Sequence, residues 1–135
     1  MSTVAQTLTA ENERVWFRIG ALSELLNEPD KATFAYENTL RHNPYNTKAL
    51  TQIASLCRMK GNYAKAVEFL RRVLEVEPEN GEIWSELGHC YLMMDDLQKA
   101  YNAYQSALFH LPNPKVINYF FDFLNSIVKL KNKTL

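Results

Sequence analysis

The side chains able to carry nucleophilic, acid–base or metal chemistry are few in this chain. Its two cysteines, Cys57 and Cys90, lack the CxxC spacing of a zinc or redox motif. Its three histidines fall on different predicted helices, without the neighbours of a catalytic triad, and are His42, His89 and His110. The pairs Asp95–Asp96 and Glu77–Glu79 lie at predicted turns, where acids cap and solvate helix ends. We therefore predict no enzyme, no cofactor and no metal site.

Composition narrows the function classes further. Fifteen basic residues balance fifteen acidic ones, which argues against broad attraction to nucleic acid or to an anionic membrane. With four glycines and neither GxGxxG nor GxxxxGK[ST], a phosphate-binding loop is excluded. No apolar run reaches the length of about 18 residues typical of a membrane span. The N-terminus lacks the features of a secretory signal, and the cysteine usage favours an intracellular location.

Residue types recur every 34 positions, which predicts a repeat architecture. Small residues recur where two antiparallel helices would approach closely, large ones where they would fill the space between hairpins, and prolines where each second helix would end. The recurring sets are Ala32, Ala66 and Ala100; Gly20, Ala54 and Gly88; Trp16, Leu50 and Trp84; Tyr36, Leu70 and Tyr104; and Pro44, Pro78 and Pro112.

The turn inside each hairpin repeats with the same period. Asn27, Gly61 and Asp95 share one slot, and these residue types tolerate a left-handed backbone at a helix end. The next slot, which starts the second helix, holds Glu28, Asn62 and Asp96. Asn46 and Asn80 similarly precede the first helices of hairpins two and three. An all-α fold follows, with predicted helices near 10–26, 30–43, 47–60, 63–76, 81–94, 97–110 and 115–130.

A binding groove is expected along the first helices of the three hairpins, because an amphipathic helix laid in such a groove is a common recognition mode. The residues opposite the packed stripe should line it. An ordinary solvated face is the competing interpretation for any one of them. They are Phe17, Ala21, Glu24, Thr51, Ser55, Arg58, Ser85, His89 and Leu92.

These recurring positions resemble the tetratricopeptide repeat (TPR). Repeat three follows its pattern almost throughout, repeat one departs from it at Ser23 and Thr39, and repeat two is the weakest match. The resemblance implies a superhelix of three hairpins followed by a capping helix. The expected segments are a flexible lead-in over 1–12, repeats over 13–46, 47–80 and 81–114, and a divergent C-terminal helix over 115–135.

A narrower resemblance is carried by the run LGHCYLMMDDLQKAYNAYQ, together with WFRIGALSELL and KATFAYENTLRHNPYNTKALTQIA. These runs are similar to the first repeats of the Cyc/Ssn-type TPR subunit of the fungal Tup transcriptional corepressor. Animal histone demethylases of the UTX/UTY type carry related repeats. The resemblance implies a nuclear adaptor that binds a helical region of a Tup-type WD-repeat subunit. It also implies contact with DNA-binding repressors and, indirectly, with histone deacetylases.

The segment after Pro114 lacks the tryptophan and glycine of a further repeat, so the chain is interpreted as a short, divergent or truncated form of this family. Its apolar residues at helical spacing predict a cap on repeat three, and a partner-binding or dimerising helix is the alternative. They are Ile117, Phe120, Phe121, Leu124, Ile127 and Val128, with Phe123 beside the stripe.

Three other functions compete with the corepressor adaptor. A co-chaperone that grips the acidic tail of a heat-shock protein needs basic groove residues, whereas Glu82 and Glu86 occupy those positions in repeat three. A generic TPR scaffold outside transcription, located in the cytoplasm, remains the alternative. A demethylase would need a catalytic domain for which these residues offer no candidate.

Overall fold

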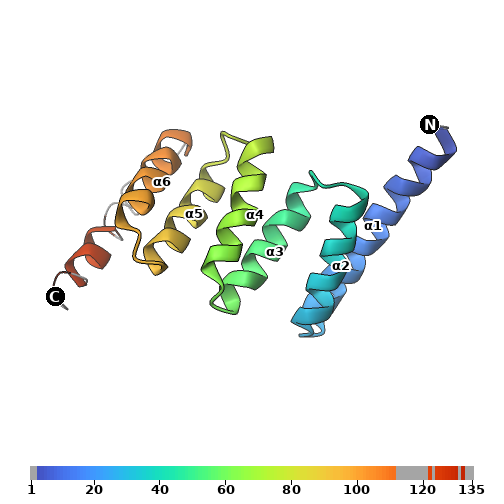
Figure 1. The fold of residues 1–135 in the computed structure, drawn as a ribbon, viewed down its shortest axis with the longest axis horizontal. Coiled ribbons are helices and arrows are strands. Elements are labelled where there is room, and N and C mark those ends of the chain that lie inside the picture. The colour runs from blue at the N-terminus through green and yellow to red at the C-terminus, as the bar shows by residue number, and fades with distance from the viewer. Residues whose placement is uncertain (1–2, 112–121, 123, 131, 133–135) are drawn as a thin grey trace.

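Six helices in the described part of the chain form three consecutive hairpins (Figure 1). The computed structural model describes residues 3–111, 122, 124–130 and 132. The hairpins stand side by side in chain order, with the two termini at opposite ends of the row. The helices are α1 (Thr3–Leu25), α2 (Pro29–His42), α3 (Thr47–Met59), α4 (Tyr63–Val76), α5 (Gly81–Met93) and α6 (Leu97–His110). The expected all-α TPR architecture is confirmed.

The turn within each hairpin has the predicted left-handed residue. Asn27, Gly61 and Asp95 have φ values of 57°, 76° and 60°. The cap that follows is made by a side chain in hairpins two and three, where Asn62 accepts from the Lys65 N–H at 3.2 Å and Asp96 accepts from the Lys99 N–H at 3.3 Å. Glu28, by contrast, makes no capping bond, and instead pairs with Lys31 at 2.7 Å.

Two of the recurring small residues, Gly20 and Gly88, lack a side chain because each one faces a buried tyrosine ring. A Cβ added at Gly20 would lie 2.5 Å from the Tyr36 ring, and one added at Gly88 would lie 2.9 Å from the Tyr104 ring. Both tyrosine side chains are buried, so neither can move aside easily. The two helices of these hairpins can therefore reach their spacing only if the facing position has no side chain.

The two departures of repeat one from the TPR pattern are accommodated by local hydrogen bonds. Ser23 and Thr39 are both buried. The Ser23 hydroxyl donates to the Ile19 carbonyl at 2.8 Å, and the Thr39 hydroxyl donates to the Ala35 carbonyl at 3.1 Å. Each buried hydroxyl thus has a partner one turn earlier in its own helix, which removes most of the cost of burying it.

The first helix starts earlier than predicted. The sequence predicted a flexible lead-in over 1–12 and a helix that starts near residue 10, and both predictions are wrong. Helix α1 begins at Thr3 and projects well past α2 (Figure 1). Residues 3–12 contain neither proline nor glycine, and the Thr7 and Thr9 hydroxyls donate to carbonyls one turn earlier. With no helix-breaking residue before Trp16, the helix simply continues toward the N-terminus.

The C-terminal segment is described only in part. Residues 122, 124–130 and 132 are helical, while Ile117, Phe120, Phe121 and Phe123 of the predicted apolar stripe lie outside the described residues, as does Pro112. Leu124 and Ile127 pack against the core shared by the three hairpins. That contact is the one a capping helix would make, and Val128 is exposed.

Candidate functional site

The predicted groove residues all lie on α1, α3 and α5, the first helices of the hairpins, whose shared surface we call the inner face. Eight of the nine are half-buried. Leu92 is the exception: it is 6% exposed and belongs to the hydrophobic core. Its assignment to the groove is therefore wrong. The last turn of α5 buries three consecutive residues, Cys90, Tyr91 and Leu92, so it has core on more than one side.

A hollow of about 440 Å³ spans the three first helices on the inner face. Among the predicted residues, Phe17 and Thr51 line it. The rest of its lining comes from positions one turn closer to the helix N-termini and from the loop before α5. These residues are Thr47, Lys48, Gln52, Glu77, Asn80, Glu82, Ile83 and Glu86. The hollow lies on the same three helices as the predicted groove residues but nearer to the helix N-termini, and its lining includes Glu82 and Glu86 of the chaperone-clamp comparison.

Carboxylates dominate the side of this hollow formed by repeat three. Glu82 is exposed, and Glu86 is half-buried beside it. Glu77 is oriented by the Thr47 hydroxyl, which donates to it at 3.1 Å, and by the Asn80 amide at 3.0 Å. Lys48 is the only base among the lining residues of this hollow. The hollow therefore presents an acidic wall that favours a basic or neutral ligand.

The opposite end of the inner face, in repeat one, is more basic. A second hollow of about 220 Å³ is lined by Arg14, Arg18 and Lys48 together with Phe17 and Glu13. The Glu13 carboxylate accepts bonds from the Asn43 amide at 2.9 Å and the Asn46 amide at 3.3 Å, so part of its charge is already satisfied. The inner face thus changes sign along the array, which would orient a bound segment of asymmetric charge.

Polar contacts link the three hairpins under the inner face. Glu24 accepts from the Tyr36 hydroxyl and from the Gln52 amide, the latter at 3.2 Å. Burial, followed by the hydrogen bond to Glu24, raises the pKa of Tyr36 well above its usual value. One step further along, Arg58 on α3 lies 3.7 Å from the Glu86 carboxylate on α5. These contacts fix the relative positions of the first helices.

His89 lies close to Arg58 of this network as a half-buried side chain. Its ring meets Tyr63 edge-on at a centroid distance of 6.4 Å. Burial and the nearby Arg58 charge lower the pKa of His89 below its ordinary value. The unfolded chain therefore binds a proton at a higher pH than the folded chain does, so folding stability is lost as pH falls below about 6.5, the ordinary histidine value.

We therefore predict that the melting temperature falls between pH 7.5 and pH 5.5, and that His89→Gln makes the fall smaller. Thermal melts followed by circular dichroism at the two pH values would measure this. His42→Gln is the control, because it removes one histidine at another position of the chain. An equal fall in the wild type and in the His89→Gln variant would contradict the assignment.

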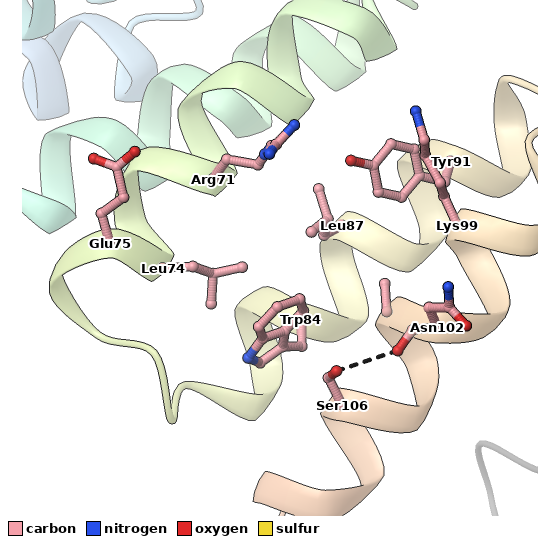
Figure 2. A pocket seen from close by; sticks show the side chains of 10 residues that line it. Arg71, Leu74, Glu75, Trp84, Leu87, Tyr91, Lys99, Asn102 and Ser106 are labelled. Atoms are coloured by element: carbon pink, nitrogen blue, oxygen red, sulfur yellow. Dashed lines mark hydrogen bonds between the residues drawn. The ribbon is translucent and has the colours of Figure 1, made fainter.

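A third hollow, of about 570 Å³, lies on the other side of α5, between α4 and α6 (Figure 2). Trp84, Leu87 and Tyr91 reach it from α5. Leu74, Arg71 and Glu75 line it from α4, and Lys99, Asn102, Ala103 and Ser106 from α6. The Lys99 ammonium lies 5.7 Å from the centre of the Tyr91 ring. The sequence did not predict this hollow, because Trp84 was expected to fill the space between hairpins.

The two cysteines have the properties of core residues. Both are buried free thiols. Burial raises the pKa of Cys57 and raises that of Cys90 to about 11. Since the thiolate is the reactive form, neither side chain is poised for nucleophilic chemistry at neutral pH. In the described part of the chain, no three His, Cys, Asp or Glu side chains are grouped to hold a metal ion, and no helix could cross a membrane.

A row of helical hairpins that repeats every 34 residues, with open hollows between its helices, defines an α-helical repeat domain of the kind that binds other proteins. The chain contains tetratricopeptide repeats: the tetratricopeptide-repeat family model matches residues 58–117. Over most of its length the chain is similar to general transcriptional corepressors.

Two such corepressors are close in sequence. The general transcriptional corepressor trfA of Dictyostelium discoideum is 57% identical over 115 residues, which is 85% of this chain and 8% of trfA. The general transcriptional corepressor ssn6 of Schizosaccharomyces pombe is 50% identical over 108 residues, or 80% of this chain and 10% of ssn6. The chain thus spans about a tenth or less of these relatives.

Among solved structures, the fold matches the first TPR domain of Spaghetti (RPAP3) bound to the HSP90 peptide SRMEEVD. The TM-score is 0.73 at 19% identity, covering 92% of this chain and 94% of that domain. At this identity the likeness shows a shared fold.

Proposed function

We propose that the chain is a nuclear TPR adaptor of a transcriptional corepressor complex. In this role it binds a helical segment of a Tup-type WD-repeat subunit and links it to DNA-binding repressors, with histone deacetylases recruited indirectly. The observation that carries the proposal is the 57% identity to a general transcriptional corepressor over 85% of the chain. Identity at that level across whole repeats exceeds what the repeat pattern alone requires, because the pattern fixes only about a quarter of the positions.

The binding surface for the helical segment would be the inner face. Its central hollow of about 440 Å³ is open to solvent along three parallel first helices and is bordered by the aromatic ring of Phe17 and the small side chain of Thr51. An apolar side chain of the segment would enter this hollow, while the flanking polar groups would fix its register.

The charges of the hollow specify the chemistry of the segment further. Glu82 and Glu86 would pair with a basic residue, and the Arg14–Arg18–Lys48 end would pair with an acidic one. The acidic peptide SRMEEVD, which the structurally similar RPAP3 domain binds, would instead place its carboxylates against Glu82 and Glu86. Repulsion in a partly desolvated groove would then prevent its binding.

Isothermal titration of the full chain with the N-terminal helical region of a Tup-type WD-repeat subunit tests the proposal. We expect saturable binding that Thr51→Arg weakens by about tenfold or more, since the long side chain would fill the hollow. Ser106→Arg is the matched control, because it fills the hollow between α4 and α6 in the same way. Absence of binding by the wild type would overturn the corepressor role. A greater loss of affinity in Ser106→Arg than in Thr51→Arg would show that the segment binds in the hollow between α4 and α6 instead.

A further inference from the structure

An exposed aliphatic stripe runs along α1. Its residues recur at spacings of four, seven, four and three, which places them on one face of the helix. In the structure they are between 41% and 69% exposed. We call this set the outer stripe, and it consists of Val4, Leu8, Val15, Ile19 and Leu22.

The equivalent positions of the other two hairpins are core positions. One and two periods after Val15, Ile19 and Leu22, the chain has small or aliphatic residues that are at most 4% exposed. They are Ala49 and Ile83, Ile53 and Leu87, and Leu56 and Cys90. In those hairpins the second helix of the preceding hairpin packs on the first helix, α2 on α3 and α4 on α5. The outer stripe thus has the residue types of a surface that another helix covers, whereas terminal repeats usually have a polar outer face.

The N-terminal part of α1 extends this surface beyond the hairpin. In repeats two and three the connection before the first helix is Pro-x-Asn, over 44–46 and 78–80. The corresponding residues, Ala10, Glu11 and Asn12, lie inside α1. The helix therefore carries the stripe past the end of α2 (Figure 1), and residues 3–12 are all exposed.

The stripe follows the heptad of a coiled coil. Within α1, Ala5, Asn12 and Ile19 occupy one core position, and Leu8, Val15 and Leu22 occupy the other. An asparagine at a single core position is a common feature of natural coiled coils, where it specifies pairing at a cost in affinity. The flanking position on one side holds Glu11 and Arg18, one heptad apart.

We propose that the outer stripe binds the outer stripe of a second copy of this chain, as an antiparallel pair of α1 helices. The antiparallel direction reproduces the way in which α2 lies on α3, because helices joined by a short connection run in opposite directions. In this arrangement the projecting turns of each copy cover the hairpin half of the other, where a preceding hairpin would otherwise pack. Leu8 of one copy faces Ile19 of the other, and the contact is two-fold symmetric.

Charge complementarity supports this occupant. When Leu8 of one copy faces Ile19 of the other, Glu11 of each copy lies opposite Arg18 of the other, which gives two ion pairs across the seam. A parallel pair would instead place Glu11 opposite Trp16 and leave Arg18 opposite Ser23. Arg18 also lines the smaller hollow of the inner face, so the pair shares this residue with that face.

Sedimentation equilibrium of the full chain at about 100 μM tests the pairing, a concentration at which a dimer of micromolar Kd is well populated. We expect twice the chain mass of 15.6 kDa. Leu8→Glu combined with Val15→Glu should raise the Kd by about a hundredfold or more, since it places four carboxylates in an apolar seam. Gln6→Glu with Ala10→Glu is the matched control on another exposed side of α1. Circular dichroism confirms that each variant is folded.

Cysteine cross-linking tests the direction. A mixture of Leu8→Cys and Ile19→Cys chains should form a disulfide under mild oxidation, whereas Leu8→Cys alone should not, because its two copies lie about 16 Å apart along the seam. The native cysteines do not interfere, since both are buried. Glu11→Arg alone should weaken the dimer, and adding Arg18→Glu should restore it.

Each contrary outcome overturns the proposal. A monomer at this concentration means that another molecule covers the stripe or that it stays exposed. A dimer that survives Leu8→Glu with Val15→Glu pairs through a different surface, such as the C-terminal helix. Cross-linking of Leu8→Cys with itself shows a parallel pair.

Discussion

Replacing Tyr36 by alanine is expected to lower the free energy of unfolding by about 3–5 kcal/mol. Tyr36 is completely buried between the two helices of hairpin one, its ring lies 5.4 Å from that of Phe17, and its hydroxyl donates to Glu24. Gly20 has no side chain that could fill the resulting cavity. Because a small domain has only about 5–15 kcal/mol of stability in total, hairpin one should unfold at much lower urea concentration. Urea denaturation followed by circular dichroism measures the change.

Two further variants separate the causes of this loss. Tyr45→Ala removes a tyrosine that is 69% exposed, and it should change stability by less than about 0.5 kcal/mol. Tyr36→Phe keeps the ring and removes the hydroxyl, so it should cost about 1 kcal/mol. If Tyr36→Ala and Tyr45→Ala had similar effects, Tyr36 would not be the packing residue that the structure shows.

The second large effect is expected in partner binding. Reversing two of the three carboxylates of the central hollow, with Glu82→Lys and Glu86→Lys, should weaken binding of the helical segment of the Tup-type subunit by about 30- to 100-fold, or about 2–3 kcal/mol. The reversal replaces an attraction with a repulsion at a half-buried site. The loss should shrink at about 1 M salt, where the screening length falls to about 3 Å. Titration calorimetry at low and high salt measures both effects.

The matched control for this variant is Glu68→Lys with Glu75→Lys. These two exposed carboxylates lie on α4, away from the inner face, and their reversal changes the net charge by the same amount. It should leave affinity nearly unchanged at moderate salt. Equal losses in both double variants would indicate that overall charge, and not the acidic wall of the hollow, determines binding. Since Glu86 also lies 3.7 Å from Arg58, Glu82→Lys alone serves as a variant that leaves this contact intact.

The sequence by itself determined the fold of the repeats. The 34-residue period predicted the hairpins, the left-handed turn at Gly61 and its equivalents, and the helix bounds to within one or two residues from α2 to α6. These features depend on local physics, namely backbone freedom at glycine, proline at helix ends and apolar spacing on a helix, and local physics can be recognised in short stretches of sequence. The resemblance to corepressors also rested on local runs, and the comparisons support it.

Only the tertiary structure decided which side chains border open space. Helical spacing assigned Leu92 to the groove, but the core around the end of α5 buries it. The same spacing did not predict that Gln52 lines the central hollow, or that Trp84 and Leu87 line the hollow between α4 and α6. The exposure of these side chains depends on how neighbouring hairpins are offset, which the spacing along one helix does not contain. Most plainly, Val15, Ile19 and Leu22 have the residue types of core positions in the repeat pattern, and only the three-dimensional arrangement shows that in α1 they face solvent. The burial of a residue in a repeat is set by its neighbours, and the first hairpin in this structure has none on that side among the described residues.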